Sequence, residues 1–101
     1  MHIVAVRFLR SFWEKHPDAE QALKSWLDEA RKARWSQPAE IKERYRSASI
    51  LKNRRVVFNI KGNDYRLVVS VAYRYQAVYV KFIRTHTEYD AIDADAVEME
   101  E

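Results

Sequence analysis

The dipeptide Gly62-Asn63 constrains the fold more than any other feature of this sequence, because it separates two runs of alternating apolar and polar residues. These runs are residues 54–61 and 64–73. A two-residue turn with glycine in its first central position is typical of a type II′ β-hairpin. Such a turn would pair Lys61 with Asp64, Asn59 with Arg66 and Val57 with Val68. Since neighbouring side chains of a strand point to opposite faces, this hairpin has one nearly all-apolar face and one mixed face.

A third strand is predicted for residues 77–85, AVYVKFIRT, after a turn near Tyr75-Gln76. With a loop of the same kind, Thr85 would face Arg66. Val78, Val80 and Phe82 would then lie on the apolar face, and Tyr79, Lys81, Ile83 and Thr85 on the mixed face. A longer loop would change this register. A slip of one residue would bury Lys81, and an unpaired buried charge is costly.

Helical spacing dominates the first half of the chain. Apolar residues within 8–13 predict a helix that Pro17 ends by Lys15 or His16. A second helix is predicted from Pro17, with Ala19, Leu23, Trp26, Leu27 and Ala30 on its apolar face. Residues 2–6 predict an opening strand, 38–44 a short helix, and Ile50–Leu51 a possible short strand. Because each long helix has one apolar stripe and the sheet one apolar face, we expect an α+β fold. In this fold N-terminal helices cover one side of an antiparallel sheet and leave the other side open.

Charge is distributed unevenly over the 101 residues, which we interpret as one domain, 1–101. All 18 Lys and Arg lie in residues 1–85 against 8 acidic residues there, whereas residues 86–101 contain 7 acidic residues. The basic part suggests a polyanionic partner or an ordinary solvated surface. From about residue 94 we expect a frayed acidic tail.

Two features bear on the cellular compartment. Cysteine is absent, which excludes disulfides and cysteine-based catalysis or metal binding. No apolar run approaches the roughly 20 residues that cross a bilayer, and MHIVAVRFLR lacks the pattern of a signal peptide. We therefore expect a cytoplasmic protein with no membrane contact.

The runs VVFNIKGNDYRLVVSV, VYVKFIRTHTEYD and FWEKHPDAEQ resemble the HigB-type toxins of bacterial toxin–antitoxin pairs. More distantly they resemble the RelE family of ribosome-dependent mRNA endonucleases. The resemblance implies a helix-plus-sheet fold whose concave, basic sheet face cuts mRNA in the ribosome, without metal or other cofactor. It also implies a cognate helix-turn-helix (HigA-like) antitoxin, which we expect to be encoded by the adjacent gene.

The resemblance implies roles for individual residues. Arg66 matches the family's strand arginine, expected to contact the scissile phosphate, and Tyr89 matches a late tyrosine expected to assist proton transfer. His86 lies where RelE relatives have an arginine. Asn59 departs from the family, because RelE has a lysine on that strand. Arg54, Arg55, Lys61 or Lys81 could supply the missing charge on the RNA-binding face, which also includes Asn59 and Thr85.

Cleavage through the 2′-hydroxyl of RNA needs a base, an acid and cationic donors for the developing charge. An imidazole gains and loses a proton near neutral pH, so His86 suits either proton role, with Asp90 as a possible orienting group. Each residue also has a structural alternative: an ion pair with Asp64 for Arg66, a surface or capping position for His86, and core-edge packing for Tyr89.

A metal site formed by His86, Glu88 and Asp90 is disfavoured, because i, i+2, i+4 spacing does not place three side chains on one face of a helix or strand. Two other functions stay open from the sequence. The chain could be a non-catalytic RNA- or ribosome-binding module, or a protein-interaction domain that binds an acidic partner.

Overall fold

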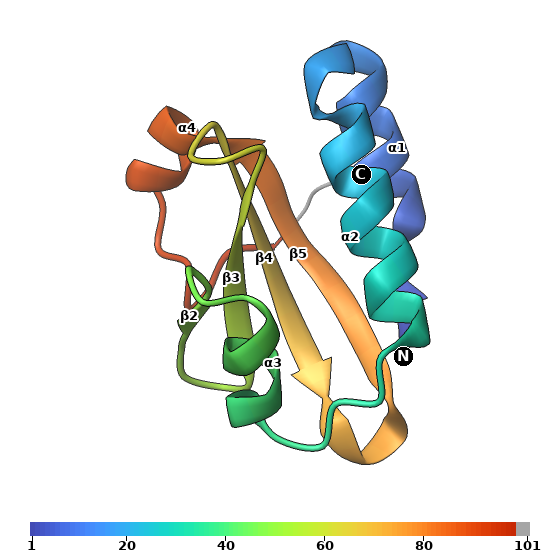
Figure 1. The fold of residues 1–101 in the computed structure, drawn as a ribbon. Coiled ribbons are helices and arrows are strands. Elements are labelled where there is room, and N and C mark those ends of the chain that lie inside the picture. Colours follow the sequence, from blue (N-terminus) through green and yellow to red (C-terminus); the bar gives the residue numbers. More distant parts are fainter. Residues whose placement is uncertain (99–101) are drawn as a thin grey trace.

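The computed structural model describes residues 1–98, which form helices packed against one five-stranded sheet (Figure 1). The strand order is β1-β5-β4-β3-β2, with β1 parallel to β5 and the other neighbours antiparallel. The elements are β1 (His2–Val4), α1 (Val6–Lys15), the 3-10 turn η1 (Pro17–Ala19), α2 (Glu20–Lys32), α3 (Pro38–Arg44), β2 (Ser49–Ile50), β3 (Arg55–Ile60), β4 (Tyr65–Ala72), the 3-10 turn η2 (Tyr73–Tyr75), β5 (Ala77–Thr85) and α4 (His86–Asp90). The predicted α+β fold is confirmed, and the parallel edge strand β1 makes the sheet mixed rather than purely antiparallel.

The N-terminal helices form where the apolar spacing predicted them, and they lie side by side along one side of the sheet (Figure 1). α1 ends at Lys15, two residues before Pro17, because proline has no backbone N–H to continue the helix. α2 begins at Glu20, preceded by the 3-10 turn that starts at Pro17. α3 has the predicted bounds, and β2 lies one residue earlier than expected. None of the helices within residues 1–98 is long and apolar enough to span a membrane.

The β3–β4 hairpin has the predicted register. Asn59 faces Arg66 and Val57 faces Val68. The Asp64 backbone N–H donates to the Lys61 carbonyl oxygen at 3.2 Å and closes the turn. Gly62 has a φ of +65°, a left-handed conformation that glycine adopts without a steric penalty.

The predicted register between β4 and β5 is wrong. Arg66 faces Arg84, and Thr85 faces Tyr65 instead of Arg66. The connection between these strands spans residues 73–76, because Ala72 and Ala77 form the last pair. It is thus longer than the two-residue turn expected from the sequence.

A β-bulge at Lys81 explains the rest of the error. Its neighbours Val80 and Phe82 face two consecutive residues of β4, so Lys81 is an extra residue in β5. Phe82, expected beneath the helices, belongs to a cluster on the opposite face, whereas Ile83 belongs to the core beneath the helices.

The two faces of the sheet differ in what covers them. The face that we call the helix side packs against α1, α2 and α3. Its strand residues are Ile3, Val56, Phe58, Ile60, Tyr65, Leu67, Val69, Val71, Val78, Val80 and Ile83. The face that we call the tail side has a smaller buried cluster of Val57, Val68 and Phe82, against which Leu51, Tyr89, Ile92, Ala94 and Val97 pack.

The chain after α4 therefore contacts the tail side. We expected fraying from about residue 94, but residues 94–98 lie against the sheet and hydrogen-bond to Arg55. Residues 99–101 lie outside the described residues. The tail side is consequently covered in part, rather than open along its whole length.

Candidate active site

Three rows of side chains cross the tail side, because residues that face each other on antiparallel strands share one face of the sheet. Nearest to the β3–β4 turn lies a polar row of Asn59, Arg66 and Arg84. The middle row is apolar and consists of Val57, Val68 and Phe82. The third row contains Arg55, Ser70 and Tyr79, with Lys81 at the bulge.

Two arginines lie opposite each other in the polar row. Like charges in directly opposing positions destabilise a sheet. The guanidinium of Arg66 is bound to neutral oxygens: Nη1 donates to the Asn63 carbonyl oxygen at 3.0 Å and Nη2 to Asn63 Oδ1 at 2.6 Å. Among the described residues Arg66 forms no ion pair with Asp64, whose carboxylate lies 3.7 Å from Lys61 Nζ. Arg66 therefore keeps a positive charge that no carboxylate of the described residues neutralises at close range.

The short helix α4 borders the polar row and begins directly after β5 (Figure 1). Thr85 is its N-cap: Thr85 Oγ1 accepts from the Glu88 backbone N–H at 3.2 Å, and Glu88 Oε1 accepts from the Thr85 N–H at 3.3 Å. The His86 backbone N–H also donates to the Asp64 carbonyl oxygen at 2.9 Å and ties α4 to the β3–β4 turn. This reciprocal cap is what the pattern Thr-His-Thr-Glu encodes.

α4 supplies the remaining candidate catalytic side chains. Tyr89 lies under the Arg66 guanidinium, whose Cζ is 5.9 Å from the ring centroid, and its ring is 6.3 Å from that of Phe82. One turn of helix separates Tyr89 from His86, whose Nε2 lies 3.2 Å from Asp90 Oδ2. The imidazole is thus oriented by a carboxylate and remains about half exposed, with 44% of its side chain accessible.

The structure therefore brings Arg66 and Tyr89 into contact and pairs His86 with Asp90, all beside the β3–β4 turn. Arg84 belongs to the same row but was missed by sequence reasoning. A signal for it existed: strict alternation along β5 would have put this arginine on the apolar face. Asn63, which holds the Arg66 guanidinium, was also missed, and its only signal was its place in the turn.

The predicted RNA-binding residues separate into four groups. Asn59 lies in the polar row and Thr85 caps α4. Arg54 is exposed in the loop before β3, with a φ of 60°. Arg55 and Lys81 lie in the third row, where both contact Glu98.

Lys61 lies apart from the other candidates. Its Nζ is 3.0 Å from Asp18 Oδ2, in the turn before α2. Asp18 also accepts from the Tyr65 hydroxyl at 2.7 Å, and these bonds lower the pKa of Asp18, the tyrosine contributing most. The same contacts raise the pKa of Lys61 and raise that of Tyr65 to about 12. Lys61 thus joins the hairpin to the helix layer.

Within residues 1–98, no three His, Asp or Glu side chains are grouped so that they could hold a metal ion. Glu88, one of the three residues weighed for a metal, bonds to Thr85 instead.

In this α+β fold a row with two arginines crosses one sheet face, and positive charges placed together attract anions. The HigB toxin family, described as the RelE-like toxic component of a toxin–antitoxin system, matches residues 19–92, and the chain belongs to this family. This match includes the polar row and α4. It ends just before the residues that bond to Arg55 and Lys81.

Curated relatives match over more of the chain. The mRNA interferase toxin HigB of Escherichia coli K12 is 29% identical over 96 residues, which cover 93% of this chain and 92% of the relative. Proteins named mRNA interferase HigB from Escherichia coli O157:H7 and Shigella flexneri match with the same identity and coverage.

Proposed function

We propose that this chain is an mRNA interferase, a toxin that inhibits translation by cutting mRNA. The observation that carries the proposal is the cross-strand pair Arg66–Arg84 beside Tyr89 and the His86–Asp90 pair. Two guanidinium groups on opposing strands present several N–H donors on one row, and a phosphodiester is an acceptor that suits such donors. Membership of the HigB family and the names of the relatives support RNA as the polyanion.

The reaction that suits these residues is attack of a ribose 2′-oxygen on the adjacent phosphorus. A base removes the 2′-hydroxyl proton, the bond from the 2′-oxygen to phosphorus forms and the bond from phosphorus to the 5′-oxygen breaks. An acid then protonates the leaving 5′-oxygen, which yields a 2′,3′-cyclic phosphate and a 5′-hydroxyl. His86 and Tyr89 are the candidates for the two proton transfers, with Asp90 holding the imidazole.

Arg66 and Arg84 would stabilise the negative charge that develops on the phosphorane. A guanidinium offers two parallel N–H groups to two phosphate oxygens, and Asn63 and the Tyr89 ring hold that of Arg66 in place beforehand. Preorganised donors of this kind are the largest contributors to many enzymatic accelerations. Asn59, in the same row, can hydrogen-bond RNA but adds no charge, which leaves the two arginines as the cations of this row.

The partners follow from the same proposal. As a toxin of a toxin–antitoxin system the protein has an antitoxin, which we propose to be a helix-turn-helix protein encoded by the adjacent gene. We further propose that cleavage takes place on the ribosome, in the cytoplasm.

Mapping mRNA 5′ ends after induction of the protein in a bacterial host tests the proposal. We expect growth arrest and new 5′ ends with the wild-type chain. Arg66→Ala should lower cleavage about 100- to 1000-fold, the usual cost of losing one such donor. Arg46→Ala, at an exposed arginine in the loop after α3, is the matched control and should cleave normally.

Two further variants separate chemistry from packing. His86→Ala should relieve the arrest, and Tyr89→Phe keeps the ring on Phe82 and Arg66 while removing only the hydroxyl. A loss of cleavage in Tyr89→Phe, with unchanged thermal stability, would assign a proton role to that hydroxyl. Absence of new 5′ ends with the wild-type chain, despite ribosome binding, would overturn the proposal in favour of a non-catalytic binder.

A further inference from the structure

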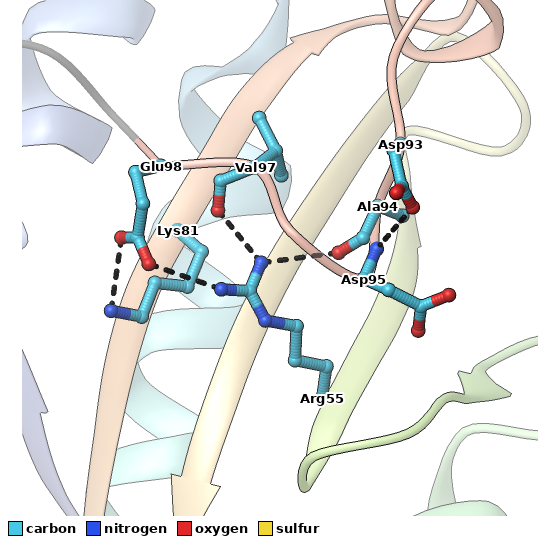
Figure 2. Close-up of polar contacts among 7 residues, drawn as sticks. All are labelled: Arg55, Lys81, Asp93, Ala94, Asp95, Val97 and Glu98. Carbon is cyan, nitrogen blue, oxygen red and sulfur yellow. Dashed lines mark hydrogen bonds and ion pairs between the residues drawn. The ribbon is translucent and has the colours of Figure 1, made fainter.

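Arg55 is the buried cation of the tail side, with 7% of the residue exposed. Its Nη1 donates to the carbonyl oxygens of Ala94 at 3.1 Å and Val97 at 2.7 Å, and its Nη2 donates to Glu98 Oε1 at 3.1 Å. Figure 2 shows the guanidinium surrounded in this way by the last described residues of the chain. A buried arginine needs such partners, because a charge removed from water without compensation is strongly destabilising.

Glu98 contacts a second cation at the same point. Its other carboxylate oxygen, Oε2, lies 3.0 Å from Lys81 Nζ, so each oxygen of the carboxylate binds one cation (Figure 2). A phosphodiester also presents two oxygens that share one negative charge, and arginine recognises carboxylate and phosphate through the same planar fork. The Glu98 carboxylate therefore occupies a position in which a phosphate group of RNA would find the same two donors.

The segment that carries Glu98 is attached weakly. Residues 91–98 form neither a helix nor a strand, so no ladder of backbone bonds joins them to the sheet. The contacts are the bonds to Arg55, the Lys81 ion pair, and packing of Ile92, Ala94 and Val97 on the small apolar cluster. The Glu98 side chain itself is 58% exposed and that of Lys81 is 25% exposed, so water and salt reach this carboxylate and weaken its ion pairs.

We propose that Arg55 and Lys81 form a phosphate-binding subsite for RNA, and that the C-terminal segment fills this subsite through Glu98 until RNA displaces it. The inference rests on the proposed function. Ser70, the β4 partner of Arg55, is four residues from Arg66. At a rise of about 3.4 Å per residue, the subsite is roughly 13 Å along the sheet from the proposed cleavage row. Both rows lie on one face, so one RNA strand would contact the two in succession.

Binding of a fluorescein-labelled 2′-O-methyl oligoadenylate, which cannot be cleaved through its 2′-oxygen, tests the proposal by fluorescence anisotropy. Glu98→Gln should bind about 3- to 10-fold more tightly than wild type, because its neutral amide no longer forms an ion pair with Lys81 or with the buried Arg55. The slope of log K against log salt concentration should steepen by roughly 0.7 for each cation released to a phosphate. Glu43→Gln changes net charge equally at an exposed position of α3 and is the matched control.

Lys81→Gln makes the test specific to the subsite. It should weaken binding more in the Glu98→Gln background than in wild type, because Glu98 masks Lys81 in wild type. Identical affinities and salt slopes for Glu98→Gln and Glu43→Gln would overturn the inference, as would failure of every variant to bind. The proposed function would survive either result and falls only if the mapping of mRNA shows no new 5′ ends.

A second measurement detects the displacement itself. The sequence contains no cysteine, so Val97→Cys introduces a single thiol in the packed segment. Its rate of reaction with a maleimide should rise several-fold when the oligoadenylate is added. Ser47→Cys, at an exposed position outside this segment, should react at an unchanged rate. Protection of the Val97→Cys thiol by the oligonucleotide would contradict displacement.

Discussion

The two faces of the sheet are built from alternate residues of the same strands, yet their side chains differ in polarity. On the helix side, eleven strand residues form one continuous apolar surface under three helices. On the tail side, a polar row, an apolar row and a row with a buried arginine follow one another along the strands. Charge is excluded from the first face and concentrated on the second.

Residues that stabilise the fold and residues proposed to act on RNA therefore lie next to each other in the same strand. Leu67 is fully buried beneath the helices, whereas its neighbour Arg66 faces Arg84 on the tail side. The helix side supplies burial of apolar surface, the dominant favourable term in folding. It can therefore hold in place the two arginines that face each other on the other face. Substitutions at adjacent positions of β4 should consequently have unlike effects.

Val69→Ala and Val68→Ala provide the sharpest comparison, because both valines are 0% exposed and adjacent in β4. On the helix side, Val69→Ala should lower the free energy of unfolding by about 2–3 kcal/mol, because packed helices cannot close the cavity. On the tail side, Val68→Ala should cost only about 1–2 kcal/mol, since the segment after α4 can move inward. Urea denaturation measures both values. Equal losses would show that the tail side is packed as rigidly as the helix side.

A smaller effect tests the polar link between the helix layer and the hairpin. Hydrogen bonds from Tyr65 and Lys61 lower the pKa of Asp18, so its contribution to stability is present at neutral pH and is lost as pH falls through its folded-state value. Asp18→Asn should therefore be less stable than wild type at pH 7, and the difference should shrink below about pH 4. Asp28→Asn, at an exposed pair with Lys32, removes a carboxylate outside this link and is the matched control.

At alkaline pH the contribution of Tyr65 to stability changes with pH in the opposite direction. The bond to Asp18 raises the pKa of Tyr65 to about 12, so its contribution is present below the usual tyrosine value and is lost as pH rises toward 12. Tyr65→Phe should abolish this alkaline dependence. Thermal unfolding between pH 9 and about 12 would measure the effect, and an unchanged profile would contradict the proposed link.

Much of the fold could be predicted because its signals are local. Pro17 and Pro38 mark helix boundaries, the spacing of Leu23, Trp26 and Leu27 defines a buried stripe, and Gly62-Asn63 sets a hairpin register. These patterns act over a few residues, and the structure agrees with each of them.

The bulge could not be predicted from alternation alone, although the positions of two cations in β5 indicated an irregularity. Strict alternation in AVYVKFIRT cannot keep both Lys81 and Arg84 out of the core. An extra residue at Lys81 resolves the conflict by placing Arg84 on the tail side as well. The sequence thus indicated Arg66 as a site residue but not its neighbour Arg84, which depends on the bulge. The contact of Glu98 with Arg55 joins residues 43 positions apart, and no local pattern encodes it.

The most direct test of the division between the faces is amide NMR of the labelled protein during titration with the 2′-O-methyl oligoadenylate. We predict that the largest shift changes fall on Asn59, Arg66, Arg84 and residues 85–90, with further changes at residues 94–98 as the segment is displaced. Amides of α1 and α2 should change little. Shift changes centred on α1 and α2, with the polar row unaffected, would contradict the assignment of the RNA site to the tail side.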